Sequence, residues 1–380
     1  MRILHTSDWH VGRTFHGRDL LADQERALEA IAGLVTEHAV DVVVVAGDLY
    51  DRAVPGAEAV EVCGRAFTRI REAGATLVVT PGNHDSAARL GVHAAFAAAG
   101  GLHLRTRTAE AGEPVVLADE YGPVAFYGLP YLEPETARHV LGIPDARGHA
   151  GVLGEAMRRV RADLADRPAG TRSVVLAHAF VVGGQASESE RTISAGGVET
   201  VPATVFDGVD YVALGHLHGP QVVTDRLRYS GSPLAYSFGE RRHHKSVWLV
   251  DLDARGLREV TRVELPVPRP LSVLSGTLPD ILADPAHDAV AEHYLSVVLT
   301  DTVRPLDPMR RLQERFPYAV HLEWRPAGAE RGDTPYAERV RGRSDLDVAA
   351  SFVDDVRRAA PSEAERVWLE RAFAAVDADR

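Results

Sequence analysis

Short and nearly continuous apolar runs recur through the first 265 residues of this chain. Five of them are Met1–Thr6, Val42–Ala46, Ala75–Thr80, Ser173–Ala177 and Asp210–Leu214. Such runs predict strands that are buried on both faces of a sheet. Near the first two runs, Asp19–His38 and Ala57–Ala73 carry apolar residues at the spacing of one helix face. This alternation predicts a layered α/β domain over residues 1–265.

The sequence changes character after Pro266, where three prolines fall within five residues. Proline-rich segments are extended, so we expect a linker and a domain boundary there. Beyond it the pattern predicts three strands, at Leu271–Leu278, Tyr294–Thr300 and Ala319–Trp324. It also predicts two helices, at Ala283–His293 and Pro308–Arg315. These elements predict a small α/β capping domain over residues 271–326.

The last part of the chain, residues 344–378, predicts a C-terminal helical pair. Apolar residues recur at helical spacing in Asp345–Ala359 and again in Ser362–Val376, and Pro361 separates the two segments. Such helices can dock another protein or pack against their own domain, and the pattern fits both. The predicted fold class is therefore a layered α/β sandwich with a small α/β domain and two C-terminal helices.

Charge and cysteine content restrict the function further. The formal net charge of −12 argues against binding nucleic acid through charge alone, because phosphate contacts come mainly from Lys and Arg. The basic run Arg241–Lys245 is predicted to be a solvated turn, with contact to a nucleic acid backbone as the alternative. Cys63 is the only cysteine, and the chain shows neither a signal peptide nor an apolar membrane span. We expect a cytoplasmic protein that does not enter a membrane.

Short segments rich in aspartate, asparagine and histidine follow the apolar runs. They are Asp8–His10, Gly47–Asp51, Gly82–Asp85, Ala177–His178 and Gly215–His218. In an α/β sheet the carboxyl ends of the strands converge on one crevice. The loops can therefore bring their side chains to one point, and their glycines let the backbone turn sharply.

Carboxylate, amide and imidazole groups suit divalent ions such as manganese, iron or zinc. Two such ions about 3.5–4 Å apart can stabilise both the attacking and the leaving oxygen of a phosphoryl displacement. Each segment alone is ambiguous: Asp8 or His10 could cap a turn, Gly82–Asp85 could be only a turn, and His178 could be a core histidine. Their joint occurrence predicts one shared dimetal site.

Taken in order, these segments resemble the signature of the calcineurin-like metallophosphoesterases. The motifs that match are Asp-x-His, Gly-Asp, Gly-Asn-His-Asp, a histidine after a strand and Gly-His-x-His. Three stretches, Ser7–Gln24, Ala46–Pro55 and Tyr229–Glu240, bring the chain closer to the nuclease subunits of bacterial SbcCD-type complexes. The resemblance covers nearly the whole chain and is most specific over its first 250 residues. It implies a metallophosphoesterase sandwich.

The resemblance also implies that seven residues hold two divalent metal ions, for which Mn2+ is the expected identity. The ligands of the first ion would be Asp8, His10 and His218. The ligands of the second would be Asn83, His178 and His216. Asp48 would bridge the two ions.

Catalytic roles follow from the same resemblance. His84 would be the catalytic histidine that meets the phosphate or the leaving oxygen, and Asp85 would orient it through its other ring nitrogen. Some relatives carry histidine where this chain has Asp51, so Asp51 either assists His84 or shapes the turn. Arg13 and Arg18 follow the first motif closely, and each could reach a phosphate or lie on the surface.

The resemblance finally implies a partner and a substrate. Such proteins act as homodimers with an SbcC-like ATPase, which the C-terminal helices would dock. The implied activity is a DNA nuclease that cuts duplex ends as an exonuclease and single strands or hairpins as an endonuclease. A phosphatase or a cyclic-nucleotide phosphodiesterase would use the same ligands, so the ligands alone do not decide. A non-catalytic scaffold for the ATPase is the alternative from another class.

Overall fold

A computed structural model of the chain describes residues 1–187, 189–190, 200–326, 342–357 and 359–378. The chain divides into two compact units, Met1–Pro268 and Arg269–Arg380. Among the described residues, no helix combines the length and the apolar character that crossing a bilayer requires.

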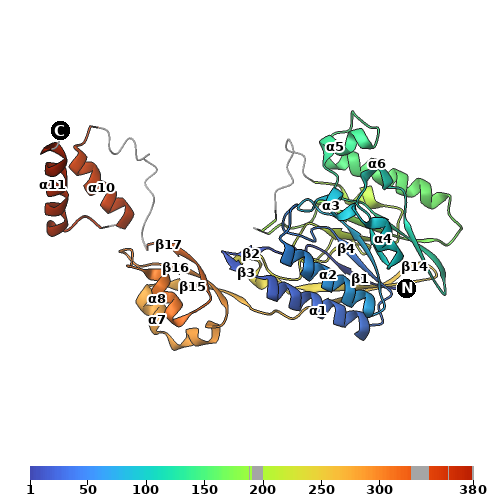
Figure 1. Cartoon of the computed structure of the whole chain (residues 1–380), viewed down its shortest axis with the longest axis horizontal. Coiled ribbons are helices and arrows are strands. Elements are labelled where there is room, and N and C mark those ends of the chain that lie inside the picture. The colour runs from blue at the N-terminus through green and yellow to red at the C-terminus, as the bar shows by residue number, and fades with distance from the viewer. Residues whose placement is uncertain (188, 191–199, 327–341, 358, 379–380) are drawn as a thin grey trace. The chain divides into compact units, whose positions relative to one another are not determined.

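Within the described residues, two six-stranded sheets form the centre of the first unit (Figure 1). The first has the order β14 (Gly256–Glu264), β13 (Ser246–Asp253), β1 (Arg2–Thr6), β4 (Val42–Ala46), β5 (Thr76–Thr80) and β6 (Leu102–Leu104). The second has the order β11 (Gln221–Val222), β12 (Leu227–Tyr229), β10 (Tyr211–Gly215), β9 (Arg172–His178), β8 (Gly122–Gly128) and β7 (Val115–Asp119). The neighbours β1, β4 and β5 are parallel, as are β8, β9 and β10.

Alternation of side chains along each strand lets one sheet serve two cores. Val42 and Val44 of β4 pack with Val174 and Leu176 of β9 between the two sheets. Their neighbour Val43 belongs to the core on the outer face of the first sheet. The runs are continuous in the sequence because both of their faces are buried, as predicted.

Helices cover the outer face of each sheet. Those packed on the first sheet are α1 (Leu21–Glu37) and α2 (Ala57–Glu72), and those on the second are α5 (Pro134–Val140) and α6 (Gly148–Ala165). Shorter elements are the hairpin β2 (Thr14–Phe15) and β3 (Arg18–Asp19) and the helices α3 (Ala87–Gly91) and α4 (Ala94–Ala99). The order helix, sheet, sheet, helix confirms the layered α/β sandwich.

The second unit contains a small parallel sheet with a core of its own. Its strands are β15 (Leu271–Gly276), β16 (Tyr294–Leu299) and β17 (Ala319–Trp324), and its helices are α7 (Leu278–Ala283) and α8 (Pro308–Arg315). Leu295 and Val297 of β16 are fully buried in this core, where they pack with Leu312 and Phe316. The three strands lie where the sequence predicts them.

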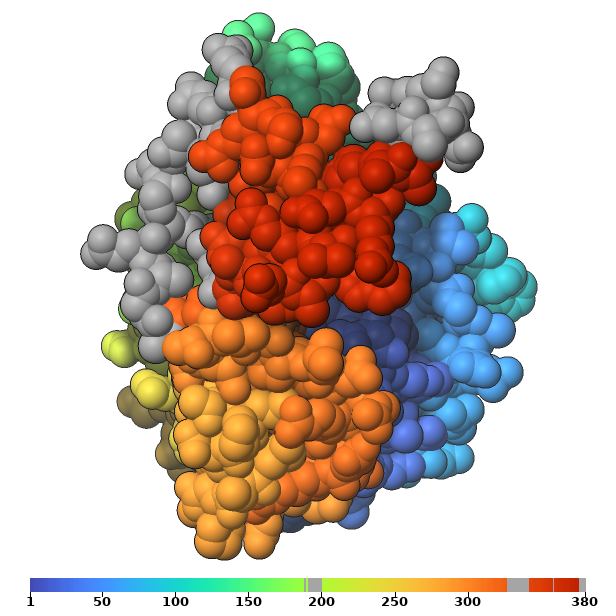
Figure 2. All heavy atoms as spheres, turned by 90° about the vertical axis from the view of Figure 1, so that its left-hand side faces the viewer, coloured from blue at the N-terminus to red at the C-terminus, as the bar shows by residue number. Residues whose placement is uncertain are grey.

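The tail forms two helices, α10 (Asp345–Arg357) and α11 (Glu363–Ala378), which pack against each other. They form one continuous red surface in Figure 2. Their positions agree with the predicted helices to within about two residues at each end, which is the usual uncertainty of helix boundaries. Most of the polar stretch Arg325–Arg343 lies outside the described residues.

The helix predicted at Ala283–His293 is wrong. The α-helix of this region lies earlier, at Leu278–Ala283, and the hydroxyl of Thr277 caps its first turn by accepting from the backbone N–H of Asp280. Pro285 has no backbone N–H, so the helix cannot continue through it. A 3-10 helix, Pro285–Val290, follows instead.

Candidate metal centre

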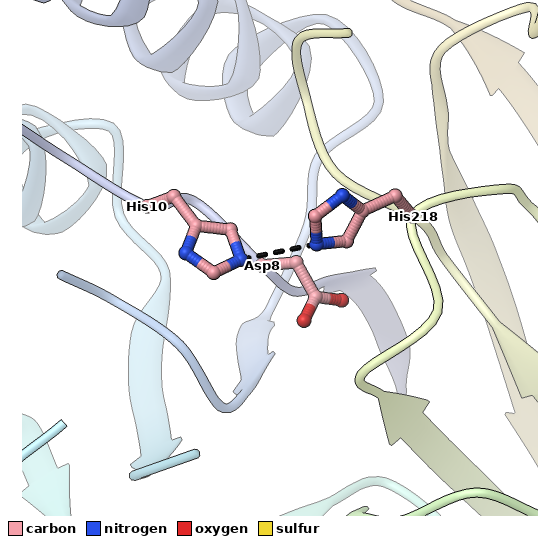
Figure 3. Close-up of side chains that lie close together, drawn as sticks. All are labelled: Asp8, His10 and His218. Carbon is pink, nitrogen blue, oxygen red and sulfur yellow. Dashed lines mark hydrogen bonds between the residues drawn. The ribbon is translucent and has the colours of Figure 1, made fainter. Parts of the chain in front are cut away.

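The predicted ligands converge at the carboxyl ends of strands from both sheets of the first unit. Figure 3 shows Asp8 and His10, from the loop after β1, meeting His218 from the loop after β10. The Nε2 atoms of His10 and His218 lie 3.1 Å apart. Atoms of Asp8, His10 and His218 that could bind a metal all lie within 4.8 Å of one another, and all three residues are buried. This is the first of the two predicted ligand sets.

Asp48, in the loop after β4, lies at the centre of the cluster. Its Oδ2 atom is 3.4 Å from Nε2 of His178 and 3.6 Å from Nε2 of His10. Nε2 of His84 lies 4.0 Å from the same oxygen. The other carboxylate oxygen, Oδ1, accepts a hydrogen bond of 2.9 Å from the backbone N–H of His84. One oxygen therefore fixes the neighbouring loop while the other faces three imidazoles.

The remaining predicted ligands lie on the His178 side of Asp48. Nε2 of His178 is 2.9 Å from Oδ1 of Asn83, and Nδ1 of His178 is 3.1 Å from the carbonyl oxygen of Ala46. The ring of His216 packs edge-on against the ring of His178, with centroids 5.3 Å apart. The backbone N–H of His216 donates to Oδ1 of Asp8 at 2.9 Å. The seven predicted metal ligands are thus brought into one cluster, together with His84.

Backbone strain is concentrated at the same place. Asp8, His10, Asp48 and His216 have φ angles of 54°, 47°, 49° and 105°. Residues other than glycine seldom adopt positive φ, and each such residue costs on the order of 1–3 kcal/mol. Strain of this kind persists only where the surrounding structure enforces it, which is typical of functional sites.

The role predicted for Asp85 is wrong. Its carboxylate accepts three hydrogen bonds of 3.0 Å, from the backbone N–H groups of Leu49, Tyr50 and Gly82. Nδ1 of His84 instead lies 2.7 Å from the carbonyl oxygen of Asp51. A carbonyl can only accept, so Nδ1 carries the proton and Nε2 faces the cluster. Asp85 therefore stabilises the loop that carries Asp48, and the backbone of Asp51 orients His84.

The electrostatics of the cluster favour positive charge beside Asp48. Burial opposes charge on His178, but the carboxylates of Asp48 and Asp8 raise its pKa to about 9. Burial lowers the pKa values of His10 and His216 well below the ordinary value. Neutral imidazoles next to ionised carboxylates are the form in which these groups bind metals.

The atoms that face one another also fit a metal centre. Nε2 of His10 lies 3.1 Å from Nε2 of His218 and 3.6 Å from Oδ2 of Asp48. Imidazole nitrogens and a carboxylate oxygen that converge in a buried cluster are consistent with a cation site. The donor set, made of carboxylate, amide and imidazole groups, fits two divalent ions.

Several supporting residues were missed from the sequence. Ser189, Glu240 and Lys245 form a buried network beside His218. The prediction that Lys245 lies in a solvated turn is wrong, because its side chain is only 3% exposed and its charge is compensated by Glu240. Glu240 lies within the stretch Tyr229–Glu240 that carried the resemblance, but its spacing indicated no role.

Arg13 belongs to the surroundings of the cluster. Its guanidinium donates to the carbonyl oxygen of Ser189 at 2.9 Å and lies over the ring of Tyr236, 5.0 Å from the ring centroid. Its Nε atom is 3.7 Å from Oδ1 of Asp51. Arg13 therefore links two loops of the centre, whereas Arg18 is exposed in β3.

Replacing Gly82 with alanine is expected to disturb the centre. A Cβ atom at this position would overlap the carboxylate of Asp48 and lie 2.5 Å from its backbone nitrogen. We expect a loss of about 1–3 kcal/mol in the free energy of unfolding, together with weaker Mn2+ binding. Gly33→Ala is the control, because a Cβ at Gly33 in α1 meets no atom within 4 Å. Urea unfolding and Mn2+ titration of both variants check this, and equal behaviour of the two would contradict it.

A buried cluster of carboxylates and imidazoles at the strand ends of a double-sheet sandwich defines a class of metal-dependent phosphoester hydrolases. Residues 1–220 match the family described as Calcineurin-like phosphoesterase, and the chain belongs to that family. The predicted resemblance to this family is thereby confirmed. Members of the family hold a dimetal centre, in agreement with the clustered histidines and aspartates.

A second match covers residues 267–357 and is described as the Type 5 capsule protein repressor C-terminal domain, SbcD_C. Among solved structures, the chain is similar to TT1561 of Thermus thermophilus, with 15% identity, a TM-score of 0.39 and coverage of 69% of this chain and 98% of that one. It is also similar to a dimetal phosphatase from Danio rerio, with 12% identity, a TM-score of 0.40 and coverage of 70% and 99%.

Proposed function

We propose that this chain is the nuclease subunit of an SbcCD-type complex. It would be a manganese-dependent DNA nuclease that degrades duplex ends and cuts single strands or hairpins in DNA end processing, repair and recombination. The observation that carries the proposal is the combination of the buried ligand cluster with the SbcD_C match at 267–357. The cluster alone would serve a phosphatase equally well, so the second match supports the nuclease.

Two divalent ions would be held by seven side chains. The first ion would take Asp8, His10 and His218, and the second Asn83, His178 and His216. Asp48 would lie between them, since its Oδ2 atom faces imidazoles of both sets. When bound, such ions lower the pKa of a water molecule and neutralise charge that develops on the phosphoryl oxygens.

His84 is proposed to act on the phosphate rather than on a metal. The hydrogen bond from Nδ1 to the carbonyl oxygen of Asp51 fixes the ring and leaves Nε2 directed toward Asp48. Nε2 can accept a proton and then donate it to the oxygen that leaves phosphorus. The same hydrogen bond from Nδ1 stabilises the imidazolium form that this transfer requires.

Metal binding is expected to weaken as the pH falls. The carboxylates around His178 hold its pKa at about 9 although burial opposes charge there, so the imidazole is protonated near neutral pH before a metal binds. An ion that binds Nε2 must displace this proton, and the affinity should fall about tenfold per pH unit below that pKa for each proton displaced. Mn2+ titrations from mildly acidic to mildly alkaline pH measure this dependence. An affinity that does not change over this range would contradict it.

DNA affinity of the isolated chain is proposed to be weak. The net charge of −12 gives little attraction for a polyanion. The homodimer and the SbcC-like ATPase would supply the additional contacts. A tight complex of the isolated chain with duplex DNA that resists salt would contradict this part of the proposal.

The tail helices are proposed to dock the ATPase. Their exposed apolar side chains are Phe352, Val356, Val367 and Trp368, of which Trp368 is 70% exposed. A partner that covers such residues gains most from the large aromatic ring. We expect Trp368→Ala to weaken the complex about 30-fold or more, as measured by calorimetry. Leu306→Ala, at another exposed position of the same unit, should leave the affinity unchanged, and equal effects of the two variants would contradict the docking site.

A comparison of substrates tests the proposed function. The purified chain, with and without its ATPase partner, would be given an end-labelled DNA duplex, a small phosphodiester and a phosphomonoester in the presence of Mn2+. We expect cleavage of the duplex to be strongly preferred and to stop when the metal is chelated. Preferred turnover of the monoester or of a cyclic nucleotide would favour a phosphatase or a cyclic-nucleotide phosphodiesterase instead.

A further inference from the structure

A buried ion pair lies beside the proposed metal ligand His218. Nζ of Lys245 is 2.5 Å from Oε2 of Glu240, and the two side chains are 3% and 0% exposed. Burying two charges is costly unless their remaining hydrogen-bonding groups are also satisfied. The partners of this pair therefore indicate what it supports.

All three donors of the Lys245 ammonium are used. Besides Glu240, they reach the carbonyl oxygen of His218 and the hydroxyl of Ser232, both at 2.9 Å. A lysine ammonium has three N–H groups and no acceptor, so its geometry here is fully determined. One of these three bonds ends on the backbone of His218.

The other oxygen of Glu240 reaches the ring of His218 through a serine. The hydroxyl of Ser189 lies 2.6 Å from Nδ1 of His218 and donates to Oε1 of Glu240. The same oxygen is 3.4 Å from Nδ1 itself. Since the hydroxyl proton goes to the carboxylate, Nδ1 of His218 must carry the proton that the hydroxyl oxygen accepts. Nε2 is then left with its lone pair directed at His10 and Asp8.

We propose that Glu240, held by Lys245, is a positioning residue that fixes the ring and the tautomer of His218 and thereby sets the affinity of one metal ion. The proposal rests on the proposed role of His218 as a metal ligand. The backbone of His218 is also held in place, because its N–H donates to Oε1 of Glu190 at 2.8 Å and its carbonyl oxygen accepts from Lys245. Carboxylates that orient a ligating histidine typically change metal affinity about 10–100-fold when they are removed.

The test is the binding of Mn2+ to the full chain carrying Glu240→Gln, followed by calorimetry and by electron paramagnetic resonance. We expect one of two Mn2+ ions to bind about 10–100-fold more weakly while the other is nearly unaffected. At limiting Mn2+, the spectrum should change from that of a coupled pair to that of a single ion. Thermal unfolding of the metal-free variants measures whether each is folded.

Two further variants keep the inference testable if Glu240→Gln fails to fold. Ser189→Ala leaves the buried pair intact and removes only its link to Nδ1 of His218, so a smaller loss of affinity at the same ion is expected. Asp119→Asn is the control, because it breaks a largely buried pair with Arg172 at the other end of β1, where Asp119 also binds the N-terminus. It should lower the unfolding temperature and leave the binding of both ions unchanged.

The outcomes separate this inference from the proposed function. If the wild-type chain binds two ions and folded Glu240→Gln or Ser189→Ala binds them equally well, the inference is overturned and the proposed function stands. If Asp119→Asn weakens Mn2+ binding as much as Glu240→Gln does, the role of Glu240 is merely structural and the inference is again overturned. If the wild-type chain binds no Mn2+, the proposed function fails and the inference fails with it.

Discussion

Replacing Asp48 with asparagine should remove DNA cleavage and the binding of at least one Mn2+ ion. Oδ2 of Asp48 faces the imidazoles of His10 and His178, so the charge lost is the one proposed to be shared by both ions. Asparagine keeps the size of the side chain and an acceptor for the N–H of His84, and the fold should therefore survive. Because both ions contribute to stabilising the transition state, we expect a loss of at least about 10³-fold in the cleavage rate.

The control for this variant is Asp41→Asn. Asp41 lies just before β4, at the opposite end of the strand from Asp48, and its carboxylate accepts from the backbone N–H of Arg2 at 2.7 Å. Asparagine can still accept that bond, so cleavage and metal content should match the wild type. Cleavage rates of the labelled duplex and Mn2+ content by atomic absorption measure both variants. Full metal occupancy in Asp48→Asn would contradict the proposed bridge.

Replacing His84 with asparagine should abolish cleavage and leave metal binding nearly intact. Nδ1 of His84 donates a hydrogen bond to the carbonyl oxygen of Asp51. Nε2 of the same ring lies 4.0 Å from Oδ2 of Asp48, so it would lie beside the proposed ions. Removing a positioned acid or base costs about 10²–10⁴-fold in rate. The measurement is the cleavage rate at saturating Mn2+ together with the Mn2+ dissociation constants.

This variant also distinguishes a catalytic histidine from a ligand. Ligand atoms of His10, Asp48 and His84 lie within 4.8 Å of one another, so the geometry alone permits His84 to bind a metal. Loss of one Mn2+ from His84→Asn would assign it as a ligand, and cleavage at the wild-type rate would remove it from the mechanism. His93→Asn, at an exposed position before α4, should behave as the wild type.

The sandwich could be predicted because its strands are buried on both faces. Val42–Ala46 has no polar residue, and that property alone separates it from a surface strand or a helix face. The hairpin of β2 and β3 could not be predicted, because each strand has two residues and no periodicity can develop. Apolar spacing over Ala283–His293 does not distinguish an α-helix from the 3-10 helix Pro285–Val290 that forms there.

The cluster could be predicted because its side chains follow strands that end at one edge. Asp48 follows β4 and His178 is the last residue of β9, so both are recognised by their place at a strand end, without any tertiary knowledge. The hydrogen bond that orients His84 could not be predicted, because its acceptor is the backbone carbonyl oxygen of Asp51. Every residue has such an oxygen, so the sequence does not indicate which one accepts. The role of Glu240 could not be predicted either, because Glu240 reaches His218 through Ser189, which is distant from both along the chain.

An anomalous-scattering map of crystals soaked in Mn2+ would show whether two ions bind at the cluster. We expect two peaks about 3.5–4 Å apart, on either side of the carboxylate of Asp48. Asp8, His10 and His218 should surround one peak, Asn83, His178 and His216 the other, and His84 should bind neither ion. A single peak, or a peak bound directly by His84, would contradict the two-metal centre proposed for this chain.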